Sequence, residues 1–128
     1  MGVSTNAYLA YGYDYGDEVP WLRDKEDCPK HLLLFWDDLE DRIDKYELEK
    51  ELLRQFGVDF VYHCSDEWRE VILAIGKSVT CASRGYPRTI THQCVVGDDW
   101  KERLDAARAW LGDNESREYN WLLASYWG

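Results

Sequence analysis

Apolar and polar side chains alternate along residues 7–15, which read AYLAYGYDY. Every second residue from Leu9 to Tyr15 is apolar or aromatic, and a period of two is typical of a β-strand. Gly12 lies on the opposite face and indicates either a kink or the close approach of a neighbouring element. The tyrosine-rich face is either a platform for a ligand or a surface covered by a helix.

From His31 onward the apolar residues are spaced three and four apart, which predicts helix. Acidic residues fill the positions between them. Asp44, with Glu47 three residues later, fits a helix N-cap. Two helices, over 31–43 and 45–56, are therefore as compatible with the pattern as one long helix.

Four later segments have the composition of strands: 58–64, 70–75, 78–83 and 120–127. Gly76 and Lys77 separate the second from the third and fit a two-residue hairpin turn with glycine first. Residues 98–111 carry apolar side chains at helical spacing behind a capping box, which predicts a helix. The last strand is apolar on both faces, which favours a central position in the sheet or cover on both sides.

The predicted order is β-α-β-β-β-α-β in a single domain covering residues 1–128. We expect an α+β fold, with a mainly antiparallel or mixed sheet of about five strands and two to three helices packed on one face. The order is loosely ferredoxin-like, and the additional strand separates it from that template.

Acidic residues outnumber basic ones, with 25 Asp and Glu against 15 Lys and Arg and a formal net charge of −10. This balance argues against direct binding of nucleic acid through its phosphates. No run approaches the roughly 20 apolar residues of a membrane span, and the start of the chain lacks the features of a secretory signal. Residues 14–51 hold 14 acids and six bases, so this third of the chain carries a net −8.

Several short segments of the chain together resemble a known group of sequences. They are the opening Ser4-Thr5-Asn6-Ala7-Tyr8-Leu9-Ala10-Tyr11-Gly12-Tyr13-Asp14, the stretch from Phe56-Gly57-Val58 to His63-Cys64-Ser65, the Arg84-Gly85 turn and the ending Leu122-Leu123-Ala124-Ser125-Tyr126-Trp127-Gly128. Together they resemble small proteins encoded by phages of actinobacteria, a family with no known activity. The resemblance implies a phage origin and a location in the cytoplasm of an infected bacterial host, and it assigns no catalytic residue. Residues 16–56 depart most from the family pattern.

The acidic residues of the predicted helical region form the leading candidate for a binding surface. A strongly negative surface attracts basic partners and speeds their association. The residues assigned to it are Asp37, Asp38, Glu40, Asp41, Asp44 and Glu47, with Trp21, Tyr13 or Tyr15 as an aromatic anchor. We therefore expect a small, non-enzymatic phage accessory protein that binds a host macromolecule, such as a nucleic-acid-handling or defence protein. A solvated face that only maintains solubility explains the same charge.

Two other classes of function stay open. The pairs Cys28/His31 and His92/Cys94 have close spacings and could supply the four ligands of a zinc site. Cys64, Cys81 or Cys94 could also act as a nucleophile beside His63 or His92. These residues are weak candidates for a small zinc-binding or Cys/His-dependent enzyme, because no signature motif surrounds them. The third class is a self-associating structural module.

Overall fold

The computed structural model describes residues 5–17, 25–65, 69–83, 85–89 and 95–127. Three of the residues assigned above to a site, Trp21, His92 and Cys94, lie outside this part of the chain.

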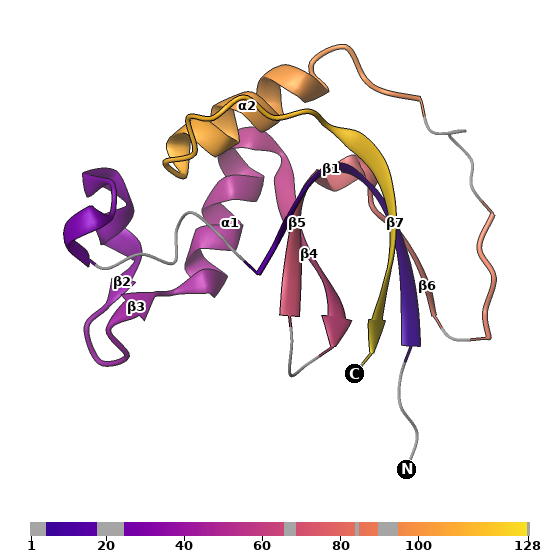
Figure 1. Cartoon of the computed structure of the whole chain (residues 1–128), viewed down its shortest axis with the longest axis horizontal. Coiled ribbons are helices and arrows are strands. Elements are labelled where there is room, and N and C mark those ends of the chain that lie inside the picture. The colour runs from indigo at the N-terminus through magenta and orange to yellow at the C-terminus, as the bar shows by residue number, and fades with distance from the viewer. Residues whose placement is uncertain (1–4, 18–24, 66–68, 84, 90–94, 128) are drawn as a thin grey trace.

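The first strand, β1 (Thr5–Gly16), organises the sheet because its two halves run in different directions. Figure 1 shows β1 rising from the N-terminal end, arching over and descending on the other side. The first half pairs antiparallel with both β7 (Asn120–Trp127) and β6 (Thr80–Ser83). The second half pairs antiparallel with β5 (Arg69–Ile75).

Gly12 is the residue at which these pairings overlap, since it faces both Asn120 of β7 and Ala74 of β5. A Cβ atom at this position would lie 1.9 Å from the carbonyl oxygen of Leu73. Only glycine allows so close an approach of another backbone. The expected approach of a neighbouring element at Gly12 is confirmed.

The strand β4 (Val58–Ser65) closes the sheet into a curled, barrel-like shape. It pairs antiparallel with β5 along its length, but parallel with β7 only at its end, where Cys64 and Ser65 face Tyr126 and Trp127. The strand order is β5-β4-β7-β1-β6, with the additional β1–β5 pairing. The α+β class and the five-stranded main sheet are confirmed.

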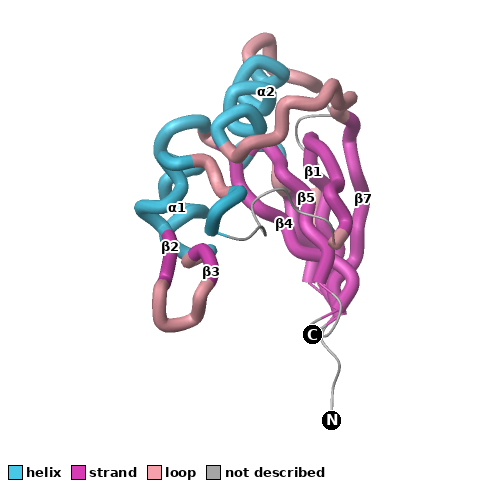
Figure 2. Tube along the Cα trace, turned by 60° about the vertical axis from the view of Figure 1, so that its left-hand side comes forward, coloured by secondary structure: helices cyan, strands magenta, loops and turns pink. Residues whose placement is uncertain are grey.

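The helices cover the outer face of β4, β5 and the second half of β1 (Figure 2). They are α1 (Lys45–Phe56), α2 (Trp100–Trp110) and the 3₁₀ helix Lys30–Phe35, while further 3₁₀ turns span Lys25–Asp27 and Gly76–Ser78. The main core forms where buried leucines of this layer, including Leu48, Leu52 and Leu104, meet Val58 and Leu73. Each such side chain stabilises the fold by about 1.5–3 kcal/mol.

A second, smaller core fills the inner face of the curled sheet. Its buried residues are Ala10, Val61, Ile72 and Ala74. The partly buried side chains that pack against them are Tyr8, Val79, Leu122 and Ala124. Two of the four buried residues are alanines, because facing strands of a small, closed sheet leave little room between them. The sheet therefore has two apolar faces, and the helices of the described residues cover the outer one.

The segment 31–43 is not an α-helix, so this part of the prediction is wrong. After the 3₁₀ helix Lys30–Phe35, the chain forms a short hairpin from β2 (Trp36–Asp37) and β3 (Arg42–Ile43). The Asp37 carboxylate accepts a hydrogen bond from Leu39 N at 2.9 Å, and Asp41 has φ 55°. Such local bonds of aspartate side chains compete with the helical pattern.

The helix over 45–56 and its cap are confirmed. The Asp44 carboxylate accepts hydrogen bonds from Tyr46 N at 3.1 Å and from Glu47 N at 3.3 Å. The helix ends at Gly57, which has φ 66° and donates its N–H to Leu53 O. The helix expected over 98–111 is found as α2.

The hairpin predicted at Gly76-Lys77 is also wrong. The strands β5 and β6 do not pair with each other, because each pairs with a different half of β1. Ser78 stabilises the connection: its hydroxyl accepts from Tyr11 N at 2.9 Å and donates to Ile75 O at 2.7 Å.

Of the two alternatives for the tyrosine face of β1, the structure shows the covered surface. Tyr15 is 8% exposed and belongs to the main core, while Tyr11 packs against Trp100 of α2. No helix in the described part of the chain is both long and apolar enough to span a membrane.

Candidate functional site

The β2–β3 hairpin lies next to the start of α1 and away from β7 (Figures 1 and 2). Residues of the hairpin, of the preceding 3₁₀ helix and of the start of α1 line a recess of about 300 Å³. We call it the hairpin surface. It is lined by Leu34, Phe35, Trp36, Asp37, Asp38, Leu39, Asp44 and Glu47. Both leucines of this lining have little contact with the rest of the protein, since Leu34 is 87% exposed and Leu39 is 97% exposed.

The hairpin surface brings together four of the six carboxylates assigned from the sequence to partner binding: Asp37, Asp38, Asp44 and Glu47. The other two, Glu40 and Asp41, lie in the turn that joins β2 to β3. Residues 37–47 contain six acids and two bases, so this short segment carries a net −4. The arrangement differs from the expected helix face, but the acidic side chains still share one region.

Three of the six carboxylates form ion pairs with neighbouring bases. Asp38 lies 3.3 Å from Lys25 Nζ and Glu47 lies 3.6 Å from Lys50 Nζ. Glu40 accepts a hydrogen bond from Arg42 Nε at 2.7 Å. All three pairs are exposed, and exposed ion pairs stabilise a fold by no more than about 1 kcal/mol.

The remaining three, Asp37, Asp41 and Asp44, have no ion-pair partner among the residues that the structure describes. Asp37 and Asp44 instead accept hydrogen bonds from backbone N–H groups. Hydrogen bonds of this kind leave the negative charge in place. The hairpin surface is therefore partly neutralised and keeps an excess of negative charge around its leucines.

The residues assigned to a zinc site have structural roles where they are described. Cys28 is buried in the main core. The His31 Nε2 atom lies 2.5 Å from the carbonyl oxygen of Trp110, and the two rings pack together. Within the described ranges, no group of three or more His, Cys, Asp or Glu side chains is arranged to hold a metal ion.

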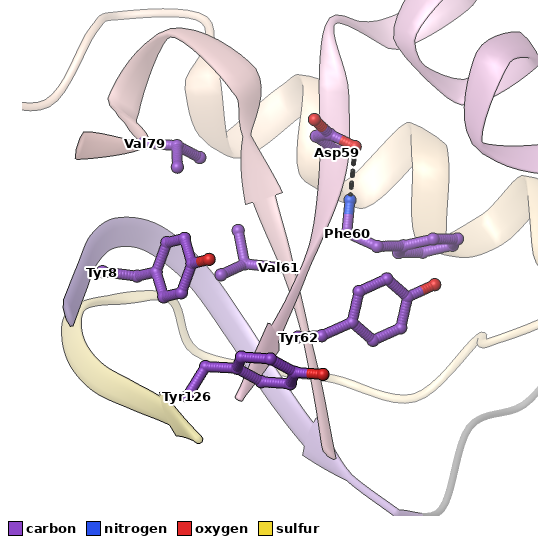
Figure 3. Close-up of a pocket in the computed structure, with 7 residues that line it drawn as sticks. All are labelled: Tyr8, Asp59, Phe60, Val61, Tyr62, Val79 and Tyr126. Atoms are coloured by element: carbon purple, nitrogen blue, oxygen red, sulfur yellow. Dashed lines mark hydrogen bonds between the residues drawn. The ribbon is translucent and has the colours of Figure 1, made fainter. Parts of the chain in front are cut away.

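A second cleft contains residues to which no sequence motif pointed. Its volume is about 360 Å³, and it opens between β4 and β7 (Figure 3). It is lined by Tyr8, Asp59, Phe60, Val61, Tyr62, Val79 and Tyr126. We call it the β4–β7 cleft. The one signal in the sequence is Asp59, a lone carboxylate inside the apolar strand VDFVYHC.

The Asp59 side chain is half-buried in this cleft. Burial raises the pKa of its carboxyl group, although the hydrogen bond that Asp59 Oδ1 accepts from Phe60 N, at 2.8 Å, acts in the opposite direction. A carboxylate with a raised pKa in a cleft is a common feature of functional sites.

Of the residues considered for a nucleophile pair, the structure describes the side chains of His63 and Cys81. The His63 Nε2 atom lies 3.0 Å from Asp14 Oδ1. Cys81 is half-buried on β6, where it faces Tyr8 of β1.

Comparison of the chain with protein-family models, with curated proteins and with solved structures finds no match.

Proposed function

We propose that this protein acts without catalysis, by binding a positively charged partner protein through the hairpin surface. The observation that carries the proposal is the pair of exposed leucines, Leu34 and Leu39, beside four carboxylates around one recess. Exposed apolar side chains bordered by charge are characteristic of protein interaction sites. The leucines would be buried by the partner, while the carboxylates select for basic side chains.

The partner class follows from the sign of the charge. Proteins that handle nucleic acids present basic grooves for phosphates, and carboxylates spaced along a hairpin can occupy such a groove in their place. The resemblance to actinobacterial phage proteins makes a host protein of this kind, or a host defence protein, the expected target.

The ion pairs on the hairpin surface are compatible with this role. Lys25, Arg42 and Lys50 form exposed pairs of low energy with Asp38, Glu40 and Glu47. Basic side chains of a partner can replace them at a cost of about 1 kcal/mol each or less. In the free protein, Lys25, Arg42 and Lys50 thus neutralise part of the hairpin surface. On docking, basic side chains of the partner take their place.

The test is affinity capture from host lysate with the wild-type protein and with variants of the hairpin surface. Leu34→Ser and Leu39→Ser remove the apolar contacts, and Asp44→Asn removes one charge while keeping an N-cap, because asparagine caps helices as well as aspartate. We expect the double leucine variant to lose the partner and Asp44→Asn, combined with Asp37→Asn, to recover less of it.

Matched controls lie elsewhere on the surface. Leu123→Ser changes a leucine that is 78% exposed on β7, and Glu118→Gln removes an exposed carboxylate. Both controls should recover the same partner as the wild type. If the double leucine variant captures that partner equally well, the hairpin surface is not the binding site.

A further inference from the structure

The β4–β7 cleft exists because the two strands pair only at their ends. In the described residues β4 pairs with β7 only at Cys64 and Ser65, whereas its residues from Val58 to Cys64 pair with β5 on the other side. The cleft formed along this part of β4 has a volume of about 360 Å³. This is within the range of sites that hold small ligands or single side chains.

Aromatic rings from three strands surround the cleft. Tyr8 comes from β1, Tyr62 from β4 and Tyr126 from β7, and Figure 3 shows Tyr126 at the lower side of the space between the other two. Each of the three is partly buried. The Tyr62 hydroxyl donates a hydrogen bond to Glu49 Oε1 of α1 at 2.5 Å, which holds this ring in place. Aromatic faces carry negative electrostatic potential and attract cations.

Asp59 places an acidic side chain in the lining of this aromatic site. Figure 3 shows its carboxyl group above Phe60, with one oxygen hydrogen-bonded to Phe60 N. No Lys, Arg or His in the described ranges forms an ion pair with it. A half-buried carboxylate without a counter-ion is unfavourable, and a bound cation relieves this cost.

We propose that the β4–β7 cleft binds an alkylammonium cation, with the tyrosine rings against its methyl groups and Asp59 as the counter-charge. The rings favour a methylated cation over a strongly hydrated ion, because methyl groups pack on aromatic faces. The carboxylate disfavours anions and neutral apolar molecules. Two sources carry this chemistry: a free quaternary amine of the choline type and a methylated lysine side chain on another protein.

The first experiment is calorimetric titration of the full chain with tetramethylammonium, with choline and with 3,3-dimethylbutan-1-ol, which has the shape of choline without the charge. We expect saturable binding of the two cations and at least about 10-fold weaker binding of the neutral alcohol. The proposal is overturned if neither cation binds at about 10 mM, or if the alcohol binds as tightly as choline.

A short peptide containing trimethyllysine, compared with the same peptide containing unmodified lysine, separates the two sources. Preference of at least about 10-fold for the trimethylated peptide over both the unmodified peptide and choline identifies a protein side chain as the ligand. Binding of choline that is equal to or tighter than that of the peptide identifies a free amine.

Substitutions of residues that line the cleft test whether the cation binds there. Asp59→Asn removes the charge while its amide oxygen can still accept from Phe60 N, and we expect about a 10-fold loss of affinity for choline. Tyr126→Leu removes one ring and should weaken binding several-fold. The control Asp98→Asn removes an exposed carboxylate outside the cleft and should bind as the wild type does.

Far-ultraviolet circular dichroism and thermal unfolding of each variant show whether it is folded. Unchanged affinity of a folded Asp59→Asn variant would exclude the cleft as the cation site. This outcome leaves the proposed role of the hairpin surface unaffected, since the two sites share no lining residue.

Discussion

Tyr15 connects two parts of the chain that lie 98 residues apart in sequence. Its buried hydroxyl donates a hydrogen bond to Asp113 Oδ2 at 2.6 Å, and burial together with Asp113 raises the pKa of Tyr15. Arg108 and Arg117 also lie 3.4 Å from Asp113. The tyrosine therefore belongs to a largely buried charged network that fixes the loop after α2 on β1.

Removing this hydroxyl should destabilise the protein. We expect Tyr15→Phe to lower the free energy of unfolding by about 1.5–3 kcal/mol, because hydrogen bonds to charged groups are stronger than neutral ones. Urea unfolding measures the change. The matched control Tyr46→Phe alters a residue that is 66% exposed and should change stability by less than about 0.5 kcal/mol. Equal effects of the two variants would show that the Asp113 contact contributes nothing.

In contrast to Tyr15, the side chain of Asp59 should lower the stability of the fold at neutral pH. Because burial raises its pKa above the unfolded value, the folded state binds the proton more tightly than the unfolded state does. This residue's contribution to stability is thus favourable at low pH and is lost as the pH rises through the folded pKa. We expect Asp59→Asn to raise the melting temperature at pH 7 and to have a smaller effect at pH 3. A lower melting temperature of Asp59→Asn than of the wild type at pH 7 would contradict the raised pKa of Asp59.

At the scale of secondary structure, local signals predicted local features correctly. Asp44 and Gly57 delimit α1 because a helix cap depends only on residues within a few positions of it. The strands of the main sheet can be recognised from alternation and composition for the same reason. The helix prediction for 31–43 is wrong because Leu39 fits a helical stripe, although it is exposed and lies two residues before Asp41, which has a positive φ.

Features that depend on distant residues could not be predicted in this way. The turn at Gly76–Ser78 has a hairpin signature, yet β1 separates the strands on either side of it. The β4–β7 cleft depends on where two strands more than 50 residues apart diverge, which no local pattern encodes. The acidic residues of the hairpin surface were identified from charge alone, but their grouping with Leu34 and Leu39 follows from the hairpin.

The bend of β1 depends on the absence of a side chain at Gly12. We expect Gly12→Ala to cost more than about 3 kcal/mol or to prevent folding, because the new Cβ would overlap the backbone of Leu73. Thermal unfolding and soluble yield measure the effect. At Gly85, with φ 79°, a Cβ would have open space, so Gly85→Ala should cost only about 1–2 kcal/mol. Similar costs at both positions would contradict the close approach at Gly12.

For the whole molecule, the net charge of −10 acts against the folded state, since like charges are closer together in the compact protein. The exposed ion pairs offset little of this repulsion. Raising sodium chloride from about 10 to about 150 mM should therefore increase the melting temperature, because salt screens charges separated by more than about 10 Å. A decrease would show that the ion pairs outweigh the repulsion.

The arch of β1 also has a consequence for how the protein is made. β1 is synthesised early, yet its first half needs β7, which begins more than 100 residues later. At roughly 5–20 residues per second, a ribosome takes about 5–20 s to reach β7. During that time the tyrosine-rich segment has no completed sheet to join, so the nascent chain is a candidate for protection by chaperones until its final strand emerges from the exit tunnel.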